Sequence, residues 1–430
     1  MKERKKRRLI YLITIACSVL FLLIGSWVVT GGQPLFDPEY NGSVKAKVEV
    51  INEVKETEVS LNGMDTQTGS TIYFEARLLS GESKGQVVYA MQTIDPYYYP
   101  QPKQIIEGDK VLIFADSEMD PNADWIMMEY VRTDALLWLG LFFAIGILLF
   151  GHMKGVNTIV SLAFTCLAVF MVFVPAVLDG RNIYFWAILV SLYIILMTML
   201  IVYGANRKSL AAGLGCFAGT LVAGVLSMVM DLFLHLTGML NDESLYLTML
   251  NGEIDLKAII FGAIIIGAIG AIMDVSMSIA SSLEEISQVS ENPTPAMLIK
   301  SGLSIGRDIM GTMANTLVLA YIGSSLSVVL LLVAHNGSLL ELLNRESIIV
   351  EILQALAGSI GILMSIPLTS FICAFLLRRA QKKDRGDSED PLRQKRAGRS
   401  KHAGRKEEPK EKTLIEKMAE ELSAEHMEEQ

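Results

Sequence analysis

The chain has 430 residues, of which 51% are hydrophobic, and a formal net charge of −9. The hydrophobic residues stand in long blocks, which is the pattern of a membrane protein rather than of a single soluble globular domain. All four cysteines fall inside these blocks, which argues against a disulfide framework and against a cysteine-based metal cluster.

A membrane-spanning helix needs roughly 20 mostly apolar residues. Eight segments meet this requirement: 9–30, 135–150, 157–178, 183–203, 210–230, 258–281, 309–334 and 350–377. The first follows the basic sequence MKERKKRR, and its apolar run is longer than the core of a signal peptide. Because GSWVVTGGQP offers no convincing small-x-small cleavage site, we expect an uncleaved signal-anchor helix; a cleaved signal peptide is the alternative.

Residues 31–133 are predicted to form a small β domain. SVKAKVEVINEV places Val44, Ala46, Val48 and Val50 on one face of a strand, and TIYFEARLL, GQVVYAMQTI, DKVLIFAD and DWIMMEYV are further strand-like runs. Five short strands favour a small β-barrel of the OB type. Acidic residues outnumber basic ones here by about two to one, which disfavours nucleic acid as a partner.

One turn of this domain, DSEMDPNAD, resembles the first part of a calcium-binding loop. Its oxygen-bearing residues alternate along the chain: Asp116, Glu118, Asp120, Asn122 and Asp124. The loop lacks the glycine and the glutamate that a complete calcium loop carries, since Pro121 and Met127 stand at those positions. An ordinary polar turn is the alternative.

The distribution of Lys and Arg predicts the topology, because these residues mark the cytoplasmic ends of spans. They occur in MKERKKRR, GHMKGVN, GANRKS, the stretch with Lys300 and Arg307, and LLRRAQKK, and the intervening connections are poor in them. We expect both termini in the cytoplasm and residues 31–133 outside. Residues 134–377 would form a seven-helix membrane domain, and 378–430 a charged, mostly disordered tail.

The segment GAIGAIMDVSMSIASS places Asp274 inside a predicted span, where a charge is unfavourable unless it meets a partner or water. Helical spacing aligns Gly267, Gly270 and Ser278 with it, and the next span carries a similar small and polar stripe. We expect the two helices to pack together, with Asp274 and Asn315 at a shared polar seam. Asp274 would be either a structural partner of Arg307 or Asn315, or part of an ion, proton or ligand path.

Two further pairs of titratable residues raise different chemistry. Asp231 and His235 lie four residues apart and could hold a metal ion or a substrate, although an ordinary interfacial pair explains them as well. Asp274 and Asp308, on consecutive spans, could share a proton as in an intramembrane aspartyl protease. Such proteases carry a Tyr-Asp pair followed by G-x-G-D, which this chain lacks, so we expect no enzymatic activity.

GAIGAIMDVSMSIASSLEEI and GRDIMGTMANTLVLAYIGSSL resemble the two most characteristic stretches of the YibE/YibF-like family of bacterial membrane proteins, in its longer, YibE-like form. The resemblance covers about residues 135–379 and implies a permease-like protein of the bacterial cell membrane without supplying a substrate, cofactor or mechanism. Ser327 stands where the family would have proline. The family motif falls on Gly267, Gly270, Asp274, Ser278, Arg307, Asp308, Gly311, Thr312, Asn315 and Gly323.

The leading hypothesis is a permease in which a small solute or ion passes along the polar seam. The chain has no G-x-x-x-x-G-K-S/T phosphate loop, so transport would be secondary or would need a partner ATPase. The alternative is a non-catalytic scaffold or accessory subunit that engages proteins through its outer domain and tail. The glycine-rich helix faces fit an oligomer as well as contacts within one chain.

Overall fold

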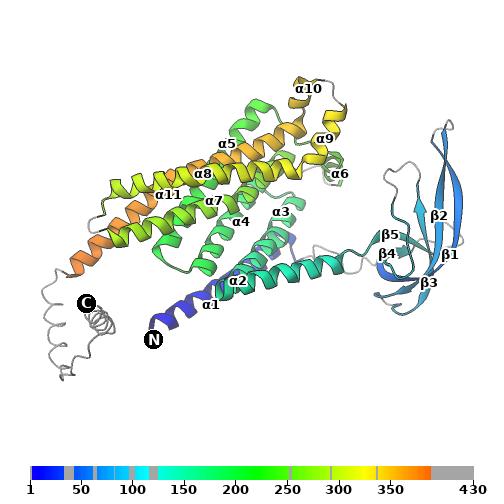
Figure 1. Cartoon of the computed structure of the whole chain (residues 1–430), viewed down its shortest axis with the longest axis horizontal. Helices are drawn as coiled ribbons and strands as arrows, with labels where there is room; N and C mark the ends of the chain where they lie inside the picture. The colour runs from blue at the N-terminus through cyan, green and yellow to red at the C-terminus, as the bar shows by residue number, and fades with distance from the viewer. Residues whose placement is uncertain are drawn as a thin grey trace, which may run out of the picture.

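The computed structural model describes residues 2–32, 43–61, 65–81, 83–95, 102–115, 124–250, 254–290, 293–335 and 338–388. A small β-barrel lies at one end of a large helical domain, and the first helix runs alongside the helix that follows the barrel (Figure 1). The protein is thus mostly helical, with one compact β unit near its N-terminus, as predicted.

Five strands form the barrel, in the order β1-β2-β3-β5-β4 with closure of β4 onto β1. They are β1 (Val44–Leu61), β2 (Asp65–Leu78), β3 (Val87–Ile94), β4 (Lys110–Ala115) and β5 (Trp125–Tyr130). β3 and β5 pair in parallel and the other pairs are antiparallel. The prediction of a five-stranded barrel is confirmed, although β1 and β2 are longer than the short strands expected.

The barrel core follows the predicted alternation only as far as Val48. Ala46 and Val48 are buried, whereas Val50 is 44% exposed. The pairing of β1 with β2 shifts register between Val48 and Val50, and this β-bulge moves Val50 to the other face; a second shift follows between Ile51 and Glu53. The prediction that Val50 shares the buried face was therefore wrong.

On the outer face of the barrel, Arg77 Nε donates to Glu49 Oε1 at 2.6 Å and its terminal nitrogen donates to Oε2 at 3.1 Å. This hydrogen-bonded arginine lowers the pKa of Glu49 from its ordinary value of 4.5. The pair should therefore stabilise the β1–β2 region above that value and cease to do so as the pH falls through the lowered pKa. We expect Glu49→Gln to speed hydrogen exchange in this region at pH 6, and we expect its difference from wild type to shrink as the pH is lowered; a difference that does not change with pH would contradict this.

The helical domain contains thirteen helical segments within the described residues, two of them short π-helices (η). They are α1 (Lys2–Thr30), α2 (Thr133–Ala168), η1 (Val169–Phe173), α3 (Val174–Leu178), α4 (Ile183–Thr198), η2 (Met199–Tyr203), α5 (Arg207–Leu234), α6 (Asp242–Leu250), α7 (Leu256–Val289), α8 (Pro295–Ser324), α9 (Leu326–His335), α10 (Leu339–Leu343) and α11 (Glu346–Ser388). Residues 378–388, which we expected to begin a mostly disordered tail, continue α11.

Six stretches of the described chain are long and apolar enough to cross a membrane. One of them, Thr133–Leu178, is a 46-residue run that contains a break at His152, where φ is 46° and ψ is −126°. A side chain at Gly155 would clash with the backbone of Ile147, so the two parts of this run lie against each other around the break. The break falls between the predicted segments 135–150 and 157–178.

The predicted span 309–334 differs most from the structure. The sequence PAMLIKSGL, which precedes the predicted span, is the beginning of the continuous helix α8. Thr294 caps this helix by accepting a hydrogen bond from the Met297 backbone at 3.3 Å, and Pro295 is well tolerated in its first turn. α8 ends at Ser324, and α9 starts after Ser325, so the helix is interrupted even though Ser327 replaces the expected proline.

α1 packs into the helical domain rather than standing apart from it. Leu22 and Val29 are buried, and the Phe21 ring stacks on Tyr193 of α4 with 4.1 Å between ring centroids. Gly25 lets α1 approach Val172 of η1 closely. α1 thus shares a hydrophobic core with η1 and α4.

The centre of the helical domain is formed by α5, α7 and α11, which cross at glycines. A Cβ atom on Gly219 of α5 would lie 2.8 Å from Ser365 Cβ and 2.9 Å from the Gly361 carbonyl oxygen of α11. A Cβ atom on Gly361 would in turn lie 2.9 Å from the side chain of Ile272 of α7. Small residues thus bring the backbones of α5 and α11 together and let Ile272 of α7 pack against both, as is common in membrane domains.

Candidate functional site

α7 has one buried side and one open side. Ile264, Ile265, Ile272 and Ile279 are almost fully buried against the neighbouring helices. The predicted stripe of Gly267, Gly270, Asp274 and Ser278 is exposed on the surface of the chain. The helical periodicity therefore identified the stripe, and the structure shows that it forms an open face rather than an enclosed channel within one chain.

α8 repeats this arrangement. Its contacts with α7 include Leu283 near Gly302 and the Tyr321 hydroxyl near Gly267, so the two helices pack together as expected. The remaining predicted seam residues are all exposed: Arg307, Asp308, Gly311, Thr312, Asn315 and Gly323. Within the described part of the chain, no hydrogen bond or ion pair joins Asp274 to Arg307, Asp308 or Asn315. We call the exposed residues of both helices the α7/α8 polar face.

Asp274 lies close enough to Tyr203 of η2 and Cys216 of α5 for its charge to act on both side chains. Tyr203 also lines a pocket of about 270 Å³ together with Tyr11 of α1 and Asn157 of α2. Among the described residues, the Tyr11 and Tyr203 hydroxyls and the Asn157 amide have no hydrogen-bond partner. The Asp274 carboxylate thus lies within electrostatic range of a pocket that contains unpaired polar side chains.

Sequence reasoning missed these pocket residues because they come from three helices that are distant along the chain. Asn206, which also lines the pocket, is already engaged as the N-cap of α5, where it accepts hydrogen bonds from the Ser209 backbone and hydroxyl. No short motif connects Tyr11, Asn157 and Tyr203. The usable signal is that each is a polar residue at the end of an apolar block.

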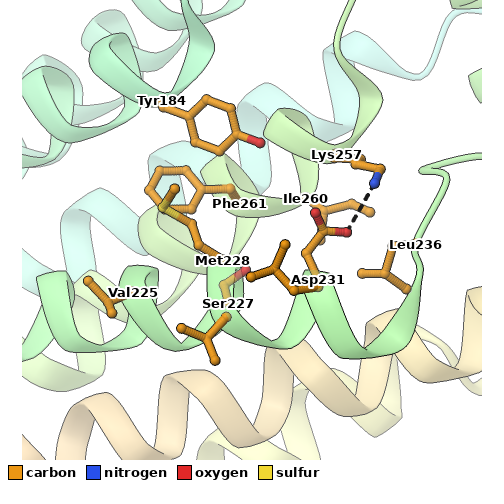
Figure 2. Close-up of a pocket in the computed structure, with 11 residues that line it drawn as sticks. Tyr184, Val225, Ser227, Met228, Asp231, Leu236, Lys257, Ile260 and Phe261 are labelled. Atoms are coloured by element: carbon orange, nitrogen blue, oxygen red, sulfur yellow. Dashed lines mark ion pairs between the residues drawn. The ribbon is translucent and has the colours of Figure 1, made fainter.

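A second pocket, of about 460 Å³, lies between α4, α5 and α7 (Figure 2). Its lining is mostly apolar, and the Tyr184 and Phe261 rings pack against each other at an angle of 56° with centroids 4.9 Å apart. At one end, Lys257 Nζ lies 3.4 Å from Asp231 Oδ1. This pairing gives Asp231 a cationic partner that the sequence analysis did not identify.

The proposed pairing of Asp231 with His235 gains no support. His235 is the C-cap of α5, with a left-handed backbone at φ 50°, and Asp231 pairs with Lys257 instead. Within the described ranges, no three His, Cys, Asp or Glu side chains gather closely enough to hold a metal ion. The ordinary interfacial interpretation is the one that the geometry favours.

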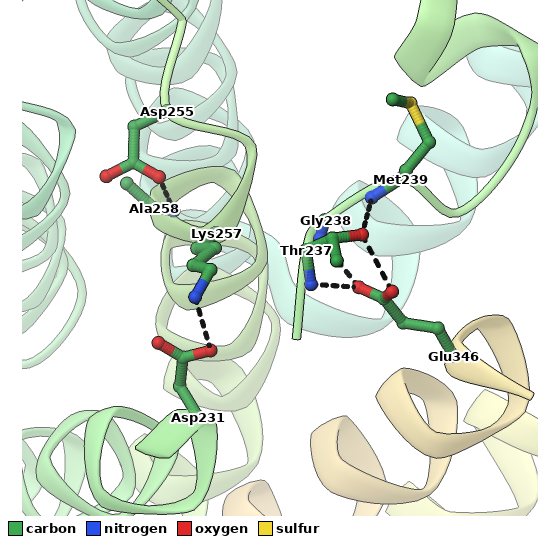
Figure 3. Close-up of polar contacts among 8 residues, drawn as sticks. All are labelled: Asp231, Thr237, Gly238, Met239, Asp255, Lys257, Ala258 and Glu346. Atoms are coloured by element: carbon green, nitrogen blue, oxygen red, sulfur yellow. Dashed lines mark hydrogen bonds and ion pairs between the residues drawn. The ribbon is translucent and has the colours of Figure 1, made fainter. Parts of the chain in front are cut away.

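A carboxylate clamp lies beside this pocket (Figure 3). Glu346, in the first turn of α11, accepts hydrogen bonds from the backbone nitrogens of Thr237 and Gly238 at 2.6 Å each and from the Thr237 hydroxyl at 2.8 Å. Gly238 has φ 83°, and a side chain there would clash with Leu256 at the start of α7. The clamp therefore fixes the loop after α5 between α7 and α11.

Two other predicted features have a limited structural description. Asp116, Glu118, Asp120 and Asn122 of the calcium-like loop lie outside the described residues, and Asp124 is exposed at the start of β5. The four cysteines are free thiols: Cys216 and Cys373 are buried, whereas Cys17 and Cys166 are exposed on the surface of the chain. The absence of a disulfide agrees with their positions in apolar helices.

A family model described as YibE/F-like protein matches residues 139–379. The matched region begins within α2 and ends within α11, so it contains the whole α7/α8 polar face and both pockets except Tyr11 and its α1 neighbour. No curated protein and no solved structure gives a significant match.

Proposed function

Because the chain belongs to the YibE/F-like protein family and carries several helices apolar enough to cross a membrane, we propose that it is a permease of the bacterial cell membrane. A small solute or ion would pass along the α7/α8 polar face by secondary transport. The observation that carries this proposal is the position of Asp274 on an open polar face, within electrostatic range of Tyr203 in the polar pocket. An acidic side chain within a span is expected to mark such a path.

The proposed topology has eight spans, with both termini in the cytoplasm and the barrel outside. The six apolar stretches become eight if the run broken at His152 crosses twice and α8 crosses as well. In support, the basic residues Lys154, Arg207 and Lys300 all lie near the helix ends that this topology places in the cytoplasm. The lipid bilayer is then one partner, and the barrel and the tail can contact proteins on opposite sides of the membrane.

Thermal unfolding of the purified protein tests the transport proposal. Wild type and Asp274→Asn would be compared from pH 5 to 8 and against ions, amino acids, nucleotides and lipids. We expect at least one solute, or the proton, to raise the unfolding temperature of wild type and to have no effect on Asp274→Asn. Asp179→Asn, on the exposed loop before α4, is the control for loss of a carboxylate. Identical responses of wild type and Asp274→Asn would contradict the proposal.

A scaffold function is the second candidate, and the β1–β2 hairpin favours it. β1 pairs with β4 only over Val44–Lys47, whereas its ladder with β2 continues to Leu61 and Asp65. The outer part of the hairpin therefore extends beyond the barrel (Figure 1). Replacing residues 55–70 by a short Asn-Gly turn should abolish a scaffold function and leave solute binding unchanged.

A further inference from the structure

The outward side of α8 around Arg307 and Asp308 is unsuited to contact with lipid. Between Gly302 and Leu317 the exposed residues are Ser304, Arg307, Asp308, Gly311, Thr312, Asn315 and Thr316, and none of them is a large apolar residue. Exposed apolar side chains, Leu319 and Ile322, appear only nearer the end of α8. Exposed residues of α5, in contrast, include Leu214, Val225 and Leu232. α8 is also absent from the helices of the described chain that are apolar enough to span a membrane by themselves. Charged groups on such a surface need a protein partner or water.

The glycines of α8 fall into two groups. Gly302 and Gly306 face α11, where an added Cβ would clash with Ser370 and Ile366. Gly311 and Gly323 lie on the exposed side, and an added Cβ would have no neighbour within 4 Å. Packing within the chain therefore explains the first group only. Small residues on an exposed face of a membrane helix allow a second helix to approach closely.

The charged residues on this face can pair with the same residues on a second copy of the chain. Arg307 and Asp308 are adjacent and exposed, and neither forms an ion pair with another described residue. In a two-fold dimer whose axis is normal to the membrane, equivalent residues lie at equal depth, and neighbouring residues of a helix differ by only about 1.5 Å in height. Arg307 of each copy can thus face the partner subunit's Asp308, and the same contact occurs twice.

We propose that a second copy of this chain covers the α7/α8 polar face, with α8 packed against the partner subunit's α8 and two reciprocal Arg307–Asp308 ion pairs at the centre. The partner's α8 would then supply the missing wall beside the Asp274 stripe. This proposal goes beyond the transport function and does not rest on it, because a non-transporting scaffold would need the same cover.

Exchange of the two charges tests the proposal. Arg307→Asp and Asp308→Arg each bring like charges together and should weaken dimerisation on the order of a hundredfold. The double variant R307D/D308R restores both ion pairs with reversed polarity, and it should dimerise as wild type does. The readout is the number of photobleaching steps of singly labelled protein in lipid bilayers at low density.

Disulfide crosslinking gives an independent readout that does not require the charge variants to fold. In a chain whose four native cysteines are replaced by alanine, Thr312→Cys should crosslink to a second copy in membranes. Met364→Cys, exposed on α11, is the control and should not crosslink. Single photobleaching steps for wild type, failure of the double variant to restore the dimer, or crosslinking of Thr312→Cys solely to a different protein would each overturn the proposal.

Discussion

Replacing Gly219 by leucine is expected to prevent assembly of the helical domain. A Cβ atom alone would lie 2.8 Å from Ser365 Cβ and 2.9 Å from the Gly361 carbonyl oxygen, and the remaining leucine atoms have no space between α5 and α11. Backbone atoms cannot move aside as a flexible side chain can. We expect a loss of more than ~3 kcal/mol in the free energy of unfolding, at or beyond the upper end of overpacking effects.

The measurement is the yield and thermal unfolding of the detergent-purified variant. Gly146→Leu is the control, because Gly146 lies in α2 and an added Cβ there has no neighbour within 4 Å. This control also replaces glycine by leucine within an apolar helix, and it should retain wild-type stability. Equal stability of Gly219→Leu and Gly146→Leu would show that α5 and α11 do not cross as described.

Replacing Glu346 by alanine is expected to release the loop after α5. The substitution removes three hydrogen bonds to a carboxylate, two of them from backbone nitrogens at 2.6 Å. Because water can replace some of these hydrogen bonds at a partly exposed site, we expect the free energy of unfolding to fall by about 2 kcal/mol. Glu346→Gln keeps an acceptor oxygen but loses the charge, so its effect should be roughly half as large.

Hydrogen exchange at Thr237 and Gly238, together with thermal unfolding, measures this effect. Glu341→Ala is the matched control. Glu341 lies in α10, the short helix before α11, and its side chain has no hydrogen bond among the described residues. We expect faster exchange at the loop in Glu346→Ala and no change in Glu341→Ala. Unchanged exchange in both variants would mean that the clamp does not hold the loop.

The features that the sequence predicted well are those set by local pattern. Long apolar blocks mark the helices, and strand alternation with intervening turns marks the five strands of the barrel. The exposure of Val50 could not be predicted, because the bulge that causes it depends on how β1 pairs with β2. Likewise, Glu346 and Thr237 are 109 residues apart, and no motif connects them.

The polar face shows how far helical periodicity can be taken. Spacing correctly aligned Asp274 with Gly267, Gly270 and Ser278, because residues three and four apart share a side of a helix. It could not show whether this side meets a neighbouring helix or the surroundings of the chain. Gly306 and Gly311 look alike in sequence, yet the first faces α11 and the second faces outward. That difference arises only from packing of the whole domain.

The most direct test of the account is whether the face around Asp274 is wet in a membrane. Ser278→Cys lies one helical turn from Asp274. The control is Met364→Cys on α11. Its neighbours Gly361 and Ile366 contact Ile272 of α7 and Gly306 of α8, so it lies at a depth similar to that of Ser278. Both would be made in the cysteine-free chain and treated with a charged, membrane-impermeant thiol reagent. We expect Ser278→Cys to react at least about tenfold faster, because the reactive thiolate forms in water. Equal, slow reaction at both positions would mean that Asp274 is a structural group in a dry interface and would contradict the permease proposal.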